Sequence, residues 1–371
     1  MAIGVLAISL AFAACGSDSS SDSAPAAAGD GSTGAGIDTA ALKSKLKPFL
    51  EPPAKIEIDE PLKERPVGKT MAYLQCSALP CKQIGEGLKE ATAALGMRFR
   101  AIEAGATPET FQGAAQQAVE YDPDVIVMSS IDASLIEKQL QEMHRKDILV
   151  VDAATSEPPA GAFDQFWLSP KETAAAGDAL ARYAILNGRG EAKVLYVNQS
   201  VFTFGPILAK SIKQVLTNEC PSCSYSDIDT LPDEVGTKIP AKVVSELQTD
   251  SSINWVVLAY GAMSVGVQEA INAAGLTDRV KILTQGASKT NYQGVKSGSE
   301  AGVLDLNFGY WSYYVADSAA RALVGQTAPD FRDKTFSYFV EKADLTFDIN
   351  KEVFNPVPGY QEQFKALWGV N

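Results

Sequence analysis

The sequence predicts an α/β fold in which two doubly wound βα lobes each hold a parallel sheet covered by helices. Short β-branched runs alternate with helical patterns from residue 67 onward, which is typical of parallel sheets with helices on their faces. The alternation breaks at residues 153–168, where Pro158, Pro159 and Gly161 interrupt any periodicity, and then starts again. With 371 residues, 46% of them hydrophobic, the chain is long enough for two packed domains.

The first half predicts four strands and three helices in alternation. Ile84, Leu88, Ala91 and Leu95 recur at helical spacing and predict one buried stripe on the first helix. The predicted elements are strand 70–75, helix 82–95, strand 97–103, helix 108–121, strand 124–129, helix 134–145 and strand 148–152.

The second half opens with a strong helix start. Ser169 is predicted to cap this helix, Pro170 to take its first position and Glu172 to reach back to the cap. Strands are predicted over residues 192–198, 224–230, 253–259 and 281–285. They alternate with helices up to Ala274, where Gly275 ends the last one.

The N-terminus carries an apolar run, residues 3–14, that ends at Cys15. A membrane-spanning helix needs about 20 apolar residues, so the run is predicted to be a signal-peptide core rather than an anchor. Small residues before a cysteine resemble a bacterial lipobox, which makes residues 1–15 a lipoprotein signal and Cys15 the lipidation site. An accidental Ala-rich N-terminus is the alternative. No Lys or Arg precedes the run, which suggests either that the start codon is placed too late or that the N-terminus has been trimmed.

Residues 16–36 contain only Gly, Ser, Asp, Ala, Pro and Thr. Such a segment cannot bury enough apolar surface to order itself, so it is predicted to be a flexible tether. Residues 16–66 together form the predicted tether and N-terminal extension.

Four cysteines remain if Cys15 is lipidated. An even number in an exported chain indicates disulfides, and the sequence separations favour Cys76 with Cys81 and Cys220 with Cys223 among three possible pairings. A zinc site at Cys220 and Cys223 is the alternative, but no second ligand pair has a suitable context. A bridge from Cys76 to Cys81 would stiffen the loop after the first strand.

The charge and the histidine count exclude several functions. The formal net charge is −13, which argues against a sequence-independent grip on nucleic acid. His144 is the single histidine and lies at the end of a predicted helix, so catalysis or metal binding that needs several imidazoles is not expected. We therefore expect no catalytic residues, no metal and no cofactor.

Several short motifs occur in the order and spacing of one known family. They are residues 87–91 with Leu95 and Gly96, residues 124–127, residues 148–152, residues 177–181 and residues 263–271. Over about residues 68–325 the chain resembles the ribose-type, or type I, periplasmic binding proteins of bacterial ABC importers. The same fold group includes repressors, which would carry a helix-turn-helix headpiece before the first lobe. This chain has the predicted lipobox and tether at that position, which favours an importer's binding protein over a repressor.

The resemblance implies lobes that are discontinuous in sequence. Three crossovers form the implied hinge, near residues 153–168, 285–287 and 305–307. The N-terminal lobe then contains residues 67–153 plus 287–305, the C-terminal lobe residues 154–286 plus 306–330, and residues 331–371 form a tail that packs on the lobes.

The resemblance also places a small-molecule ligand at the carboxyl ends of the strands. Sugar binders of the family sandwich a pyranose between aromatic rings and fix its hydroxyls with charged groups. Here residues 77–81 replace the stacking pair, Ala153 stands where an arginine commonly follows the aspartate, and Tyr260 with Gly261 replaces an Asn-Asp pair. The candidate ligand-binding residues are Gln75, Ser77, Ser129, Asp152, Phe202, Phe204, Tyr260, Gln285, Asp305 and Asn307.

The residues near this crevice favour an aromatic or poorly hydroxylated ligand over an ordinary monosaccharide. Trp167, Phe308, Tyr310 and Trp311 are further aromatic candidates, although core packing is the alternative for Trp311 and its neighbours. Aromatic faces favour planar or apolar ligands, and unpaired sugar hydroxyls would each cost about 1 to 3 kcal/mol.

The predicted activity is capture by hinge closure, in which ligand contacts both lobes and only the closed form satisfies both sets of contacts. The implied protein is an extracytoplasmic, lipid-anchored monomer that delivers its ligand to an ABC permease. A ligand-sensing lipoprotein that signals to a membrane receptor is one alternative. A hydrolase with Asp152 and Asp305 as a carboxylate pair is another.

Overall fold

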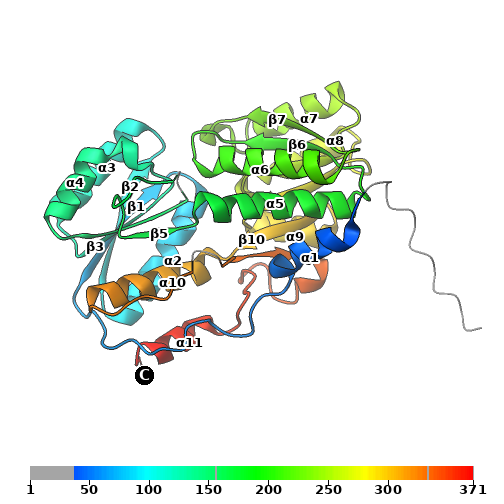
Figure 1. The fold of residues 1–371 in the computed structure, drawn as a ribbon. Helices are drawn as coiled ribbons and strands as arrows, with labels where there is room; N and C mark the ends of the chain where they lie inside the picture. Colours follow the sequence, from blue (N-terminus) through cyan, green and yellow to red (C-terminus); the bar gives the residue numbers. More distant parts are fainter. Residues whose placement is uncertain (1–36, 155–156, 332–333, 371) are drawn as a thin grey trace, which may run out of the picture.

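The computed structural model describes residues 37–154, 157–331 and 334–370. The predicted signal, the lipidation site Cys15 and the tether up to residue 36 lie outside the described residues. Two lobes lie side by side, each built on its own sheet (Figure 1). The predicted class, an α/β protein with parallel sheets in two lobes, is confirmed.

The first lobe holds a five-stranded sheet in which every neighbouring pair is parallel. Its central strands are buried on both faces, because helices cover both sides. The strand order is β2 (Arg98–Gly105), β1 (Thr70–Cys76), β3 (Val125–Ser129), β4 (Leu149–Ala153) and β5 (Gln165–Trp167).

The helices of the first lobe begin and end at local signals. Pro108 opens α3 behind a capping box at Thr107, and Gly96 ends α2 in the left-handed conformation. Gly87 of α2 lies so close to α10 that an added Cβ would be 2.8 Å from the Ser312 side chain. The helices are α2 (Leu79–Leu95), α3 (Pro108–Tyr121), α4 (Glu137–Arg145) and α10 (Phe308–Leu323), with a short 3-10 turn η1 (Ala133–Leu135).

The second lobe holds a six-stranded sheet that is parallel except at one edge, where β11 runs antiparallel to β10. The strand order is β11 (Ser337–Val340), β10 (Glu300–Leu306), β9 (Lys281–Gln285), β8 (Trp255–Leu258), β6 (Lys193–Asn198) and β7 (Ser224–Asp229). The helices and 3-10 turns are α5 (Pro170–Asn187), α6 (Phe204–Glu219), η2 (Pro232–Glu234), α7 (Ile239–Thr249), η3 (Gly261–Ser264), α8 (Val267–Ala273), α9 (Lys289–Ser297) and η4 (Lys342–Asp344).

Three predicted lobe assignments are wrong. Residues 165–167 belong to the first lobe rather than the second, because β5 pairs with β4. Residues 287–305 belong to the second lobe, because β10 pairs with β9 and α9 packs against β10 and β11. Residues 306–330 do not stay in the second lobe, because α10 joins the core of the first. The crossovers therefore lie just after β5, just after β10 and between α10 and β11, and none lies at residues 285–287.

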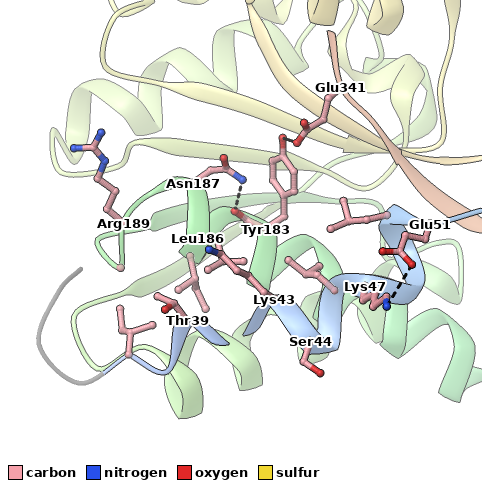
Figure 2. Close-up of a pocket in the computed structure, with 15 residues that line it drawn as sticks. Thr39, Lys43, Ser44, Lys47, Glu51, Tyr183, Leu186, Asn187, Arg189 and Glu341 are labelled. Carbon is pink, nitrogen blue, oxygen red and sulfur yellow. Dashed lines mark hydrogen bonds and ion pairs between the residues drawn. The ribbon is translucent and has the colours of Figure 1, made fainter. Parts of the chain in front are cut away.

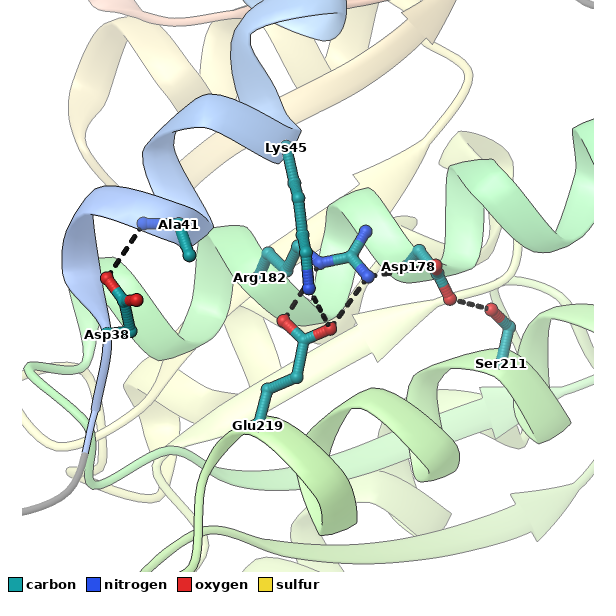
Figure 3. Close-up of polar contacts among 7 residues, drawn as sticks. All are labelled: Asp38, Ala41, Lys45, Asp178, Arg182, Ser211 and Glu219. Atoms are coloured by element: carbon teal, nitrogen blue, oxygen red, sulfur yellow. Dashed lines mark hydrogen bonds and ion pairs between the residues drawn. The ribbon is translucent and has the colours of Figure 1, made fainter.

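The first described helix, α1 (Thr39–Leu50), is anchored on the second lobe. Leu42, Leu46 and Phe49 are buried in that lobe's core. Arg182 holds the Glu219 carboxylate with two hydrogen bonds of 2.9 and 3.0 Å, and Lys45 of α1 reaches the same carboxylate at 2.9 Å (Figure 3).

Both ends of the chain then continue onto the first lobe. Residues 38–66, which we call the N-terminal strap, run from α1 to a stretch in which the Leu62 amide donates to the Leu367 carbonyl at 3.0 Å. Residues 334–370, the C-terminal strap, run from β11 to α11 (Tyr360–Leu367), which packs on α10. In Figure 1 the blue N-terminal strap follows α11 along the lower edge of the molecule.

Both local disulfides predicted from the spacing are present. Cys76 is bonded to Cys81 and Cys220 to Cys223, which rules out the alternative of a zinc site at the second pair. No helix in residues 37–154, 157–331 or 334–370 is long and apolar enough to cross a membrane.

Candidate functional site

A cavity lies between the two lobes, at the carboxyl ends of their strands. First-lobe residues after β1, β3 and β4 face second-lobe residues after β8 and β9 and the first turns of α5 and α6. Its volume is about 80 Å³. A water molecule takes about 30 Å³ and small-molecule sites commonly span about 300 to 1,000 Å³, so this cavity is smaller than a typical ligand site.

The first-lobe wall is built by the loop after β1. The disulfide from Cys76 to Cys81 closes this loop, and Cys81 lies in the first turn of α2 and faces the cavity. The Cys81 Sγ is 3.3 Å from the Ser129 Oγ, which lies 2.7 Å from the Tyr73 hydroxyl. Burial raises the pKa of Tyr73, so this chain of groups is uncharged.

The second-lobe wall is aromatic. Phe204 opens α6 and stacks on Phe202 with a centroid distance of 5.6 Å and an interplanar angle of 7°. Tyr260 meets Phe204 edge-on at 6.2 Å. The Tyr260 hydroxyl donates to Gln199 Oε1 at 2.8 Å, and burial raises the pKa of Tyr260 to about 12, so the ring stays neutral.

Polar groups on the cavity wall are few. Glu172 is the only charged side chain among the described residues that line it, and it accepts from the Ser169 amide at 2.8 Å in the capping box of α5. The other polar side chains on the described wall are five hydroxyls and one amide, from Ser129, Ser130, Thr173, Tyr260, Ser337 and Gln285. No described lining residue carries a guanidinium or an ammonium group, so the bidentate donors that hold carboxylates are absent from this part of the wall.

The structure brings four of the ten predicted ligand-binding residues to the cavity: Ser129, Phe204, Tyr260 and Gln285. Phe202 is fully buried behind Phe204. Among the aromatic candidates, Phe308 lines the cavity, whereas Trp311, Tyr313 and Tyr314 are buried in the first-lobe core.

Three further predicted residues lie elsewhere around the first sheet. Gln75 donates to the Glu103 carboxylate at 2.9 Å, because the two residues are register partners on the neighbouring strands β1 and β2. Ser77 is exposed and its amide donates to the Gly105 carbonyl. Asp152 is fully buried within β4 and does not line the cavity.

Asp305 and Asn307 serve the second lobe and the hinge rather than the cavity. The Asp305 carboxylate accepts from the Ala287 amide at 2.9 Å and from the Tyr292 hydroxyl at 2.7 Å. Burial raises the pKa of Asp305 to about 6. Asn307 caps α10 and donates to the Phe354 carbonyl at 2.6 Å. These bonds explain why both polar side chains lie at the hinge without facing a ligand.

Sequence reasoning missed part of the wall. Ser130 follows β3 directly, so the strand-end rule that found Ser129 could have found it. Ser337 belongs to β11 in the predicted tail, and Thr173 and Ala176 lie on the side of α5. No local pattern places these three residues at the cavity.

A larger cavity of about 920 Å³ lies within the second lobe, between α1 and α5 (Figure 2). Tyr183 lines it and donates to Glu341 at 2.8 Å, and Lys47 pairs with Glu51 at 3.6 Å. The described residues that line this larger cavity all belong to the second lobe, and none of them follows a parallel strand. The smaller interlobe cavity is therefore the candidate site.

Comparison with known proteins places this geometry in a family. Residues 81–327 match the family described as "Periplasmic binding protein domain", and the chain belongs to this family. Its members bind solutes, and the enzyme alternative is thereby set aside. No curated protein sequence matches the chain significantly.

Solved structures with the same fold are solute-binding proteins of transporters. The 5-methylthioribose transporter solute binding protein from Thermotoga lettingae TMO is 14% identical, with a TM-score of 0.69 over 84% of this chain and 100% of that chain. GanP, a glucose-galactose binding protein from Geobacillus stearothermophilus, is also 14% identical, with a TM-score of 0.65 over 76% and 99% of the two chains. A carbohydrate transporter solute binding protein from Agrobacterium radiobacter, in complex with D-arabinose, is 18% identical, with a TM-score of 0.64 over 78% and 99%.

Proposed function

We propose that this protein captures a small, aromatic or otherwise poorly hydroxylated organic molecule in the interlobe cavity and delivers it to an ABC permease. Capture occurs by hinge closure, since ligand contacts with both lobes are complete only when the lobes meet. The protein acts outside the cytoplasm as a monomer, held to the membrane by a lipid on Cys15.

The composition of the cavity wall carries this proposal. Phe204, Tyr260 and Phe308 offer aromatic surface, and Glu172 is the single charged group on the described part of the wall. A sugar with four or five hydroxyls needs a matching number of donors and acceptors, because each buried unpaired group costs about 1 to 3 kcal/mol. The described wall carries five hydroxyls, from Ser129, Ser130, Thr173, Tyr260 and Ser337, and one amide, from Gln285. The hydroxyls of Ser129, Thr173 and Tyr260 already bond to other groups of the protein, so the wall suits a ligand with few polar groups.

A sugar ligand is the second candidate. The similar structures named above include proteins described as glucose-galactose binding and as complexes with D-arabinose and 5-methylthioribose. 5-Methylthioribose carries a methylthio group in place of one hydroxyl, so it combines a sugar ring with the lower hydroxyl content that the proposal favours.

A thermal-shift screen of the purified chain decides between these ligands. Aromatic acids, nucleosides and sterols are compared with 5-methylthioribose, D-glucose, D-galactose and D-arabinose. A ligand at 100 times its Kd adds about 2.7 kcal/mol, which raises the Tm of a lobe-sized unit by roughly 5 to 10 °C. If only the fully hydroxylated sugars raise the Tm, the proposed ligand class is wrong and the sugar alternative holds.

Variants of the aromatic wall locate the site of any compound that binds. Tyr260→Ala is expected to weaken binding of that compound at least tenfold by calorimetry, because it removes one face of the cavity. Tyr225→Ala is the matched control, since Tyr225 is a half-buried ring on β7 of the same lobe and does not line the cavity. Equal affinity in both variants would move the binding site away from this wall.

The role after capture needs a separate test. Proteoliposomes containing a candidate permease and its ATPase should hydrolyse more ATP when the loaded protein is added. Activation of a membrane receptor without ATPase stimulation would favour the sensing alternative. Labelling with a radioactive fatty acid that disappears in Cys15→Ala checks the lipid anchor.

A further inference from the structure

Phe202 belongs to the second lobe by sequence but is buried by the first. It lies between β6 and α6, and its side chain is fully buried. Its buried apolar cluster consists of Cys76, Ala78 and Cys81, all from the first lobe. The cluster therefore exists only while the lobes are together.

The disulfide fixes the first-lobe half of this cluster. Cys76 ends β1 and Cys81 lies in the first turn of α2, with their Cα atoms 5.5 Å apart. The bond pins the intervening loop, and Ala78 and Cys81 face both Phe202 and the cavity. A flexible loop here would lose conformational freedom each time the lobes closed.

A second interlobe contact lies beside Phe202. The Thr203 hydroxyl donates to the carbonyl of Ala154, the residue that follows β4. On the opposite side of the cavity, the Gln83 amide donates to the Ala287 carbonyl at 3.3 Å. These two polar contacts are partly buried, whereas the apolar contact of Phe202 is fully buried.

We propose that Phe202 and the Cys76–Cys81 disulfide form a closure contact that positions the two lobes around the cavity. The disulfide loop is the first-lobe surface on which Phe202 seats, and Phe202 in turn backs Phe204 of the cavity wall. Phe202 is thus a positioning residue that sets affinity by stabilising the closed form. This inference rests on the proposed capture by hinge closure.

The size of the effect follows from the burial. Removing a fully buried phenylalanine side chain from such a contact lowers the closed-to-open ratio roughly 10- to 100-fold. Ligand affinity falls in proportion to the closed fraction of the ligand-free protein.

The test uses the ligand-free full chain and needs no knowledge of the ligand. We expect Phe202→Ala to increase the radius of gyration measured by small-angle X-ray scattering. We also expect amides in residues 76–81 and 199–205 to exchange with deuterium at least tenfold faster. Phe202→Leu keeps an apolar side chain and should restore part of both signals.

The chain supplies matched controls for each half of the contact. Cys76→Ala/Cys81→Ala should accelerate exchange at residues 199–205 in the other lobe, which loss of a local loop constraint alone would not do. Cys220→Ala/Cys223→Ala removes the other local disulfide and should leave the radius and these residues unchanged. Phe111→Ala removes a buried ring inside the first lobe and should lower the Tm without opening the lobes.

Two results would overturn the inference. One is an open radius for the wild-type chain that Phe202→Ala leaves unchanged. The other is a Cys76→Ala/Cys81→Ala variant whose faster exchange stays within residues 76–81. Neither result affects the ligand screen, so failure of the closure contact and failure of the proposed function are separable.

Discussion

Glu300 is a buried carboxyl group whose protonation should control the stability of the second lobe. It begins β10, is 1% exposed, and accepts hydrogen bonds from Gln268 at 2.7 Å and from Asn291 at 3.0 Å. Burial raises the pKa of Glu300 from its ordinary value of 4.5 to about 8. The group is therefore neutral in the folded protein at pH 7 and ionised in the unfolded chain.

The sign and size of the pH dependence follow from these two pKa values. The folded state holds the proton more tightly, so the contribution is complete below about pH 4.5 and is lost as the pH rises through about 8. Each tenfold difference in proton affinity is worth about 1.36 kcal/mol, so the whole contribution is roughly 5 kcal/mol. Between pH 5.5 and 7.5 the loss is roughly 3 kcal/mol.

Glu300→Gln removes the titration while preserving the shape of the side chain. Urea unfolding of the wild type and the variant at several pH values between 5.5 and 7.5 gives the difference in their free energies of unfolding. As the pH rises from 5.5 to 7.5, we expect the free energy of unfolding of the wild type to fall by roughly 3 kcal/mol relative to that of Glu300→Gln. Glu269→Gln changes an exposed carboxylate on nearby α8 and should give a constant difference. Parallel curves for the wild type and Glu300→Gln would refute the reasoning.

Three other substitutions test the packing. Gly87→Ala places a Cβ 2.8 Å from the Ser312 side chain and should lower the free energy of unfolding by about 1 to 3 kcal/mol in urea titrations; an unchanged value would mean that α2 and α10 separate freely. Arg321→Met leaves the Asp317 carboxylate buried without its 2.7 Å ion pair and should cost about 3 to 5 kcal/mol, whereas a neutral result would show that the pair contributes nothing. Leu46→Ala should cost about 2 to 5 kcal/mol and speed amide exchange in α1; unchanged exchange would mean that α1 is not anchored by this residue.

Between β1 and β9 the order of strands and helices could be predicted from local patterns, apart from the short strand β5. Helix 108–121 and strand 281–285 have the predicted bounds. Local signals fix both elements: Thr107 caps the helix, and an apolar run forms β9. The helix predicted from residue 82 begins at Leu79, since Pro80 suits a first turn. Strand β5 lies within residues 153–168, where the sequence shows no periodicity, so it could not be predicted.

The sheet that a strand joins could not be predicted in the same way. β10 was assigned to the first lobe through a family resemblance, but its partners β9 and β11 are a tertiary choice that leaves no local mark. The same limit applies to the site. Tyr260 lies after β8 and Gln285 ends β9, so the strand-end rule identifies both. Ser337 reaches the cavity only because the tail returns as an antiparallel strand.

The two straps have a consequence for anyone cutting this protein into fragments. A piece trimmed to residues 81–327 would lose β1 from the middle of its sheet and the aromatic cover of α10, where Tyr313 stacks on Trp368 at 5.5 Å. The stripped rings would face water and favour aggregation. Because the N-terminal and C-terminal straps pack on both lobes, a fragment for expression should begin near residue 38 and run to the C-terminus.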